Sequence, residues 1–308
     1  MSTQTLILIA IAGFAAQLVD GGLGMGFGAT SMTILTTLAA MAPATASAVV
    51  NTAQLGTTVV SGFAHWRFGN VNWKVVFLIG VPGAIGSFVG ATLLSNISLD
   101  AARPLTAAIL AGIGVFLLLR FSRGKVQRTQ ADRPLNKPVL SGLGLVGGFI
   151  SASGGAGWGP VTTSALLASE RLEPRRVVGT VSTAEFLVTV AAVIGFVFGL
   201  WEELTANLAA AVALLIGGVL GAPLAAWAVS RMNSSLLGGA VGTLLVLLNL
   251  PKLLDALNVG EPWTTVINIL VLIIGVLAAG VGTYRARRNR AALAADGEPA
   301  TGVVKAPV

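Results

Sequence analysis

The sequence predicts an all-helical integral membrane protein built from two related halves in opposite orientations. Of its 308 residues, 55% are apolar and only 10% are charged, whereas soluble domains carry about 25% charged residues. Several apolar runs are long enough to cross a hydrocarbon core of about 30 Å. An internal repeat, with its copies about 130 residues apart, predicts the two halves.

Two glycine-rich segments mark this repeat. Each has alternating glycines after a polar residue, and each is followed by a proline that lies eight residues before a polar quartet. Repeats that combine broken apolar helices with polar residues at matching depth are typical of secondary transporters. The first copy contains Asp20-Gly-Gly-Leu-Gly-Met-Gly26, Pro43 and Asn51-Thr-Ala-Gln54; the second contains Ser153-Gly-Gly-Ala-Gly-Trp-Gly159, Pro174 and Ser182-Thr-Ala-Glu185.

The first half is predicted over residues 1–121. Its opening apolar segment has the first glycine segment at its middle, and glycines in mid-helix favour a break. We therefore expect a re-entrant hairpin, which enters and leaves the membrane on one side. Three apolar stretches follow, and Pro43 suits the first turn of the first of them. The hairpin is expected over 5–41 and the three transmembrane helices over about 43–66, 74–95 and 103–121.

The basic linker 122–137 leads to the second half, predicted over 138–250. Its first segment, 138–169, has 32 residues and would be roughly 48 Å long as one helix, too long for a simple crossing. The glycines and Pro160 at its centre should break it, so we expect a second hairpin. We further expect transmembrane helices over about 174–200, 204–230 and 234–250, an external loop over 251–262, an extra transmembrane helix over 263–284 and a basic, disordered cytoplasmic tail over 285–308.

The basic residues predict the orientation in a plasma membrane, which in a bacterium is the inner membrane. Cytoplasmic loops are rich in Lys and Arg, so both the linker 122–137 and the tail 285–308 should be cytoplasmic. Five apolar segments lie between them, and both assignments hold only if segment 138–169 does not cross. Each half then crosses an odd number of times, which inverts one half relative to the other. The N-terminus is then outside, the C-terminus is cytoplasmic, and only Arg103 and Lys252 of the 19 basic residues lie outside.

Two further glycine-rich stretches, Gly80–Gly86 and Gly217–Pro223, complete the pattern. With the paired glycine segments and the two polar quartets, residues 6–250 resemble the sulfite exporter TauE/SafE family of transporters. The resemblance implies transport of a small sulfur-containing anion, such as sulfite, thiosulfate, sulfoacetate or another organosulfonate. The final apolar segment and the basic tail lie outside it.

The glycine segments are the first candidate site. The second half-helix of each hairpin is expected to begin near Gly24 or Gly157, with unpaired N–H groups and a positive dipole end at mid-membrane. Glycine lets an anion approach such a backbone closely. The alternative is that the glycines serve close helix packing, and Met25 and Trp158 likewise could line a pocket or pack. The candidate glycines are Gly22, Gly24, Gly155 and Gly157.

The polar quartets are the second candidate site. Eight residues beyond a helix-starting proline is about 12 Å of rise, close to the bilayer midplane. Side chains three residues apart share one helix face, and amides and hydroxyls donate hydrogen bonds to sulfonate or sulfite oxygens. The alternative is interhelical hydrogen bonding, worth about 0.6–2 kcal/mol per pair. The candidate substrate-binding residues are Asn51, Gln54, Ser182, Thr183 and Glu185.

Two acidic residues are predicted within the membrane. A charged carboxylate at the midplane is costly, so Glu185 is expected to be neutral there. It would then carry a proton during transport or, alternatively, act as a structural acid bonded to the opposite half, for example to Gln54. Asp20 could join a proton path or cap the half-helix that follows it.

Other function classes fit the sequence less well. An aspartyl protease would need a second membrane aspartate beside Asp20, and a serine protease a basic partner, whereas His65, the only histidine, is predicted at the interface. With no cysteine and one histidine, we expect no enzyme activity, metal or cofactor. The net charge of +7 lies mainly in loops, so the expected partners are lipid and a small anion and not nucleic acid. The alternative function is an anion channel, or a transporter of another small carboxylate or inorganic anion.

Overall fold

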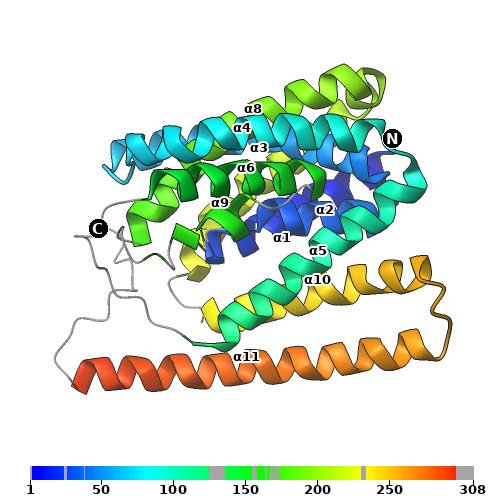
Figure 1. Ribbon diagram of the computed structural model, residues 1–308. Helices are drawn as coiled ribbons and strands as arrows, with labels where there is room; N and C mark the ends of the chain where they lie inside the picture. Colours follow the sequence, from blue (N-terminus) through cyan, green and yellow to red (C-terminus); the bar gives the residue numbers. More distant parts are fainter. Residues whose placement is uncertain are drawn as a thin grey trace.

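All regular elements of the described residues are helices in the computed structural model (Figure 1). The chain thus has the all-helical class that its sequence predicts. The expectations for residues 125–135 of the basic linker and for the tail beyond Ala295 concern residues outside the description; residues 285–295, expected to be disordered, are helical instead, because the last helix continues to Ala295. The described residues are 2–23, 26–37, 39–124, 136–154, 158–163, 165–166, 169, 172, 174–229 and 234–295.

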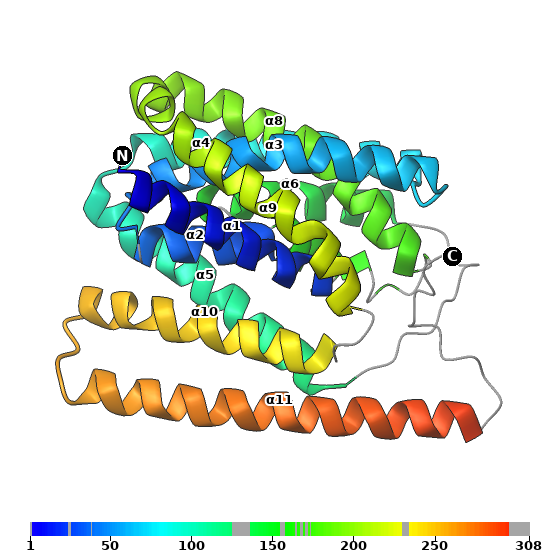
Figure 2. The ribbon, with the colours of Figure 1, turned by 180° about the vertical axis from the view of Figure 1, so that it is seen from behind.

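The helices form a bundle and run back and forth between its two ends (Figures 1 and 2). In chain order they are α1 (Thr3–Leu23), α2 (Phe27–Thr37), α3 (Pro43–Arg67), α4 (Trp73–Asn96), α5 (Leu99–Ser122), α6 (Lys137–Gly154), the short π-helix η1 (Gly159–Thr163), α8 (Pro174–Ala206), α9 (Leu208–Val229), α10 (Ser234–Ala256) and α11 (Trp263–Ala295).

Local sequence explains where several helices start. Pro43 and Pro174 are the first residues of α3 and α8, where the missing N–H removes no helical hydrogen bond. Asn72 and Ser98 precede α4 and α5, and each side chain accepts a hydrogen bond from a backbone N–H of the first turn. These caps satisfy donors that a helix start leaves free.

The glycine segments separate helices in both halves of the sequence. In the first half, α1 ends at Leu23 and α2 begins at Phe27. Between them Gly26 has a φ angle of +130°, which residues with a Cβ atom rarely adopt. In the second half, α6 ends at Gly154 and η1 begins at Gly159. The predicted interruptions of the two apolar segments are therefore present.

Helices of the two halves pack against each other in matching pairs. The first helix of the first half, α1, packs on α9 of the second half. In the same way the first helix of the second half, α6, packs on α4 of the first half. The glycine-rich stretches allow this contact, because a Cβ atom at Gly217 would overlap the backbone oxygen of Ala10 and one at Gly86 would overlap that of Leu145. The helices α3 and α8 form a further pair, as do α5 and α10.

The connections sort to two ends of the bundle. In Figure 1 the N-terminus, the α4–α5 and α8–α9 turns and the α10–α11 loop lie at one end. We call this the outer end; the α3–α4 loop and the end of α11 lie at the opposite end. There Arg285 Nη1 donates to the backbone oxygen of Ser122 at 3.3 Å, and Asn289 Nδ2 donates to that of Gly124 at 2.9 Å. The basic ends of α5 and α11 therefore lie side by side.

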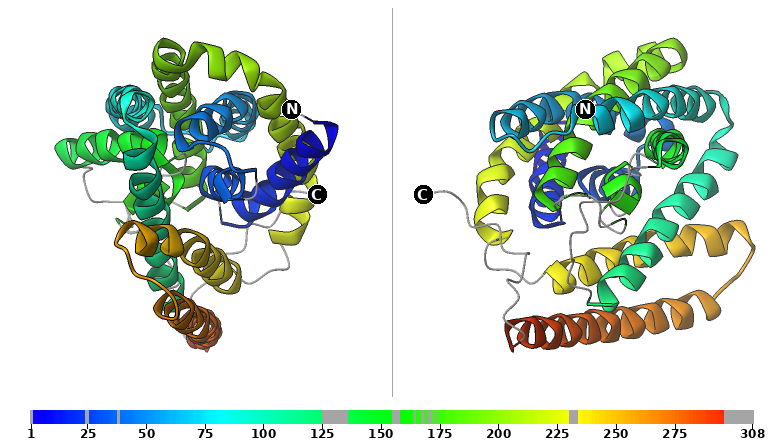
Figure 3. Two further views of the ribbon diagram at one scale, coloured as in Figure 1. Left: turned by 90° about the vertical axis from the view of Figure 1, so that its right-hand side faces the viewer. Right: turned by 60° about the vertical axis from the view of Figure 1, so that its left-hand side comes forward.

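Helix length and composition describe a multi-pass membrane protein. Six helices of the described residues are long and apolar enough to cross a membrane. The helix α11 lies outside the main bundle against α10 and α5 (Figure 3), and large apolar side chains along it are exposed. Segment Thr3–Asp20 of α1 also qualifies as a span by these criteria, and α3 does not. The six candidates are Thr3–Asp20, Trp73–Asn96, Ala101–Ser122, Arg176–Ala206, Gly238–Ala256 and Trp263–Asn289.

Candidate functional site

The two polar quartets face each other across the α3–α8 contact. Gln54 Nε2 on α3 donates a hydrogen bond to Glu185 Oε1 on α8 at 3.1 Å. These residues occupy the same position in the two sequence copies, so the bond joins corresponding points of the two halves. It is also the contact that the structural alternative for Glu185 expects.

Asn51 connects the first quartet to the second glycine segment. Its side chain is fully buried, and its Nδ2 donates to the backbone oxygen of Ser47 at 2.8 Å and to the Ser47 hydroxyl at 3.3 Å. The Ser47 hydroxyl in turn donates to the backbone oxygen of Ala152 in α6 at 2.6 Å. Asn51 Oδ1 has no hydrogen-bond partner within the described part of the chain. The amide is therefore held in place beside the end of α6 with an oxygen still free to accept.

The remaining quartet residues lie on α8 at the same level. Ser182 and Thr183 are partly exposed. The Thr183 hydroxyl donates to the backbone oxygen of Gly179 at 2.7 Å, and Gly62 of α3 packs against the side chain of Thr183. Thr183 therefore lies at the α3–α8 interface, close to the Gln54–Glu185 pair along the helix.

Trp158 is buried beside the second glycine segment. It is 1% exposed, and its Nε1 donates to the backbone oxygen of Val181 at 3.0 Å. Its ring lies against Gly83 of α4 and Gly147 of α6. These contacts favour the packing alternative for Trp158. Gly22 lies in the last turn of α1; the predicted positions Gly24, Met25, Gly155 and Gly157 fall outside the described residues.

Asp20 lies at the end of α1 and contacts the start of α2. Its Oδ1 accepts a hydrogen bond from the backbone N–H of Phe27 at 3.4 Å. A carboxylate near the first N–H groups of a helix satisfies free donors and complements the helix dipole. The contact favours the capping alternative for Asp20, with α2 beginning three residues later than the predicted start near Gly24.

Buried hydroxyls beside both glycine segments extend the polar site beyond the predicted residues. Within the described ranges, the side-chain oxygens of Thr30, Ser31, Ser153 and Thr163 have no hydrogen-bond partner although all four residues are buried. Most buried polar atoms are hydrogen-bonded, because leaving one unpaired costs about 1–3 kcal/mol. The repeat itself carried a signal for them, since Thr30 and Thr163 each lie four residues beyond the last glycine of their segment.

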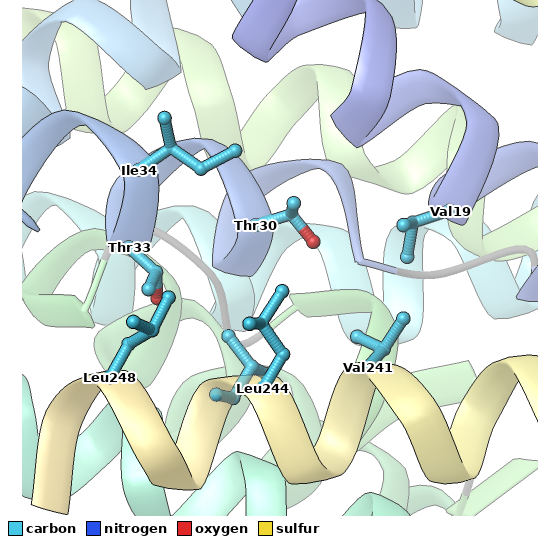
Figure 4. Close-up of a pocket in the computed structure, with 8 residues that line it drawn as sticks. Val19, Thr30, Thr33, Ile34, Val241, Leu244 and Leu248 are labelled. Carbon is cyan, nitrogen blue, oxygen red and sulfur yellow. The ribbon is translucent and has the colours of Figure 1, made fainter. Parts of the chain in front are cut away.

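A small, mainly apolar hollow lies between α2 and α10 (Figure 4), and no quartet residue lines it. Thr30 and Thr33 contribute its hydroxyl groups. Val19 and Ile34 line it together with four residues of α10, namely Val241, Leu244, Leu245 and Leu248. The hollow therefore contains the unpaired Thr30 hydroxyl, four residues beyond the last glycine of the first glycine segment.

Known proteins resemble the chain over most of its length. The family model described as "Sulfite exporter TauE/SafE" matches residues 9–251. Over 254 residues the chain is 41% identical to "Probable membrane transporter protein YtnM" of Bacillus subtilis (strain 168), covering 82% of this chain and 84% of the relative. Over 239 residues it is 29% identical to "Probable membrane transporter protein YdhB" of the same organism, covering 76% and 95%. No solved structure matches.

The matched region contains both glycine segments and both quartets, and it ends before α11. The broken apolar helices, the polar pair between α3 and α8 and five of the six candidate membrane spans thus lie in, or overlap, the part that the family shares; the sixth span, Trp263–Asn289, lies beyond it. The relatives' names describe membrane transporters. This chain, which carries one further helix after the shared region, belongs to the sulfite exporter TauE/SafE family of membrane transporters.

Proposed function

We propose that the protein is a secondary transporter that moves a small sulfur-containing anion by alternating access. The substrate is sulfite, thiosulfate or an organosulfonate such as sulfoacetate, and it binds near the midplane between the two halves. One observation carries the proposal: the hydrogen bond between Gln54 and Glu185 joins equivalent positions of the repeat. A polar site at such an interface is where transporters built from repeats bind substrates.

We also propose the inverted topology, with re-entrant hairpins over 5–41 and 138–169. Two observations support it. The exchange of packing partners, α1 with α9 and α6 with α4, suits two halves related by a two-fold axis in the membrane plane. The basic ends of α5 and α11 lie side by side, as expected if the linker and the tail share the cytoplasmic side.

The binding chemistry relies on neutral donors. An oxyanion inside the membrane needs hydrogen bonds to replace its water. Amide donors of Asn51 and Gln54 and the hydroxyls of Ser182 and Thr183 lie near the interface, and the hydroxyls of Thr30 and Thr163 lack partners in the described residues. The start of α2 adds backbone N–H groups and a positive dipole end. Glu185 in its neutral form donates as well and serves as the proton carrier, with Asp20 as the second candidate.

Transport assays test the proposal directly. Purified protein in liposomes should exchange radiolabelled sulfite, thiosulfate or sulfoacetate, and unlabelled anion inside should drive transient accumulation of label. This counterflow separates a transporter from a channel, which shows none. Sulfate and acetate serve as comparison anions for the alternative substrates. Absence of flux for the whole set, with protein that is folded in the liposomes, contradicts the proposed function.

A further inference from the structure

A row of threonines follows one face of α2 from the outer end of the bundle inward. Thr30, Thr33 and Thr36 are three residues apart and Thr37 follows, so they share a face. Thr30 and Thr33 line the hollow against α10 (Figure 4). Thr36 and Thr37 contact Lys252 of α10. The row therefore leads from a basic residue at the outer end towards the first glycine segment.

Lys252 lies at the outer end of this row. Its Nζ donates to the Thr37 hydroxyl at 3.0 Å and to the Thr36 hydroxyl at 3.3 Å, and the side chain is half-buried. An ammonium group has three donors, so these two bonds leave one for another acceptor. Both partners are neutral, so neither cancels the positive charge. Only Arg103 and Lys252 are predicted to place a positive charge on this side.

The inner part of the row has buried polar atoms without partners. Asn249 is fully buried, and its Nδ2 donates to the Thr33 hydroxyl at 3.2 Å and to the backbone oxygen of Leu245 at 2.9 Å. Neither Asn249 Oδ1 nor Thr30 Oγ1 has a hydrogen-bond partner in the residues that the structure describes. Thr30 lines the hollow, so its hydroxyl gains a hydrogen bond when water or a polar solute occupies that space.

The polar residue Asn249 on α10 has no polar counterpart at the equivalent position of α5. The helices α5 and α10 cross where Gly114 and Gly242 each lie against the other's backbone oxygen. Seven residues further along each helix, α5 has Phe121 and α10 has Asn249. The equivalent position of α5 therefore has a large apolar side chain, which lies against Gly238 near the other end of the antiparallel pair. The amide on α10 serves the side facing α2, where the hydroxyls are.

We propose that Lys252, with Thr36 and Thr37, forms an outer binding site that recruits a small oxyanion. The hydroxyls of Thr33 and Thr30 then form a polar path from it towards the glycine segment. This inference rests on the proposed transport function and adds the route by which the anion reaches the central site from outside. A charge at the mouth raises the local anion concentration, and neutral hydroxyls further in release the anion readily.

The chain contains no cysteine, so a single cysteine placed at position 252 can be alkylated selectively to restore, remove or reverse the charge there. In right-side-out vesicles Lys252→Cys should raise the half-saturating concentration of radiolabelled sulfite at least about threefold at low ionic strength. Alkylation with 2-bromoethylamine, which rebuilds a lysine-like ammonium, should restore the parent value. Iodoacetamide, which adds a neutral amide donor, and iodoacetate, which adds a carboxylate, should not. Arg103→Cys is the matched control at the same end and should keep the parent value.

A purely structural role gives different results. If Lys252 only ties α2 to α10, the neutral amide from iodoacetamide should restore uptake as well as the ammonium does, and Lys252→Gln should behave like the parent. Either outcome overturns the inference while sulfite exchange by the parent upholds the proposed function. A parent protein that moves no oxyanion overturns both.

The path is tested through its hydroxyls. Thr33→Val keeps the shape of the side chain and removes the hydroxyl, and we expect it to slow sulfite uptake severalfold. Thr33→Ser should restore uptake, and thermal unfolding in detergent checks that both variants are folded. Equal uptake by folded Thr33→Val and the parent rules out the hydroxyl path.

Discussion

Replacing Glu185 by Gln removes the proton from the α3–α8 pair and little else. The Gln54 amide donates to Glu185 Oε1 at 3.1 Å, and the carbonyl oxygen of a Gln at position 185 can accept the same bond. Interhelical hydrogen bonds in membranes contribute about 0.6 kcal/mol on average. We therefore expect the free energy of unfolding of Glu185→Gln to stay within about 1 kcal/mol of the parent value.

The transport phenotype should be much larger than this stability change. If Glu185 carries one proton per cycle, a gradient of one pH unit supplies about 1.4 kcal/mol, which is about tenfold accumulation of substrate at zero membrane potential. Glu185→Gln should lose this accumulation entirely. Binding and sulfite counterflow should persist, because the amide still donates hydrogen bonds. Both are measured in liposomes with a set internal pH and a potassium–valinomycin clamp.

The matched control breaks the hydrogen bond and keeps the carboxyl. Gln54→Ala removes the donor to Glu185, so it should weaken substrate binding while pH-driven accumulation continues at saturating substrate. Asp20→Asn tests the other membrane carboxyl in the same assay. Tenfold accumulation by Glu185→Gln would refute its role as the proton carrier and leave it as a structural acid or a substrate ligand. If Asp20→Asn also accumulates normally, coupling through a buried carboxyl is wrong.

The remaining predictions use variants in liposomes or detergent. Asn51→Ala and Ser182→Ala should each weaken sulfite binding while the yield of folded protein stays close to that of the parent; unchanged affinity in both, by titration calorimetry, argues against the quartets as the site. Single cysteines in the external loop should react with an impermeant thiol reagent from outside, and those in the basic linker and the basic tail should not; labelling of linker and tail from opposite sides removes the second hairpin. Gly217→Val should destabilise the fold by about 1–3 kcal/mol because its side chain would meet the α1 backbone, whereas Gly112→Ala, with open space around it inside α5, should unfold at or above the parent temperature.

Composition and repeat patterns were sufficient to predict the helical class, the membrane setting and the family. The length of an apolar segment is a local property of the sequence. The tendency of glycines to end a helix is also local, and α1 ends at Leu23 and α6 at Gly154, next to the glycine segments. The repeat also pointed to Gln54 and Glu185 as equivalent residues. The sequence alone, however, predicts only that Gln54 and Glu185 lie at the same membrane depth and does not predict that they form a hydrogen bond.

Tertiary packing decided which of the alternative roles each side chain takes. Trp158 could line a pocket or pack, and the backbone oxygen of Val181 and the glycines around its ring favour packing. Asp20 could join a proton path or cap a helix, and its contact with the Phe27 N–H favours the cap. The sequence predicts only that Lys252 is a basic residue outside the membrane, whereas the packing of α10 on α2 brings its ammonium group to Thr36 and Thr37. Partners more than 200 residues apart meet only through the crossing of helices, and that crossing depends on the whole bundle.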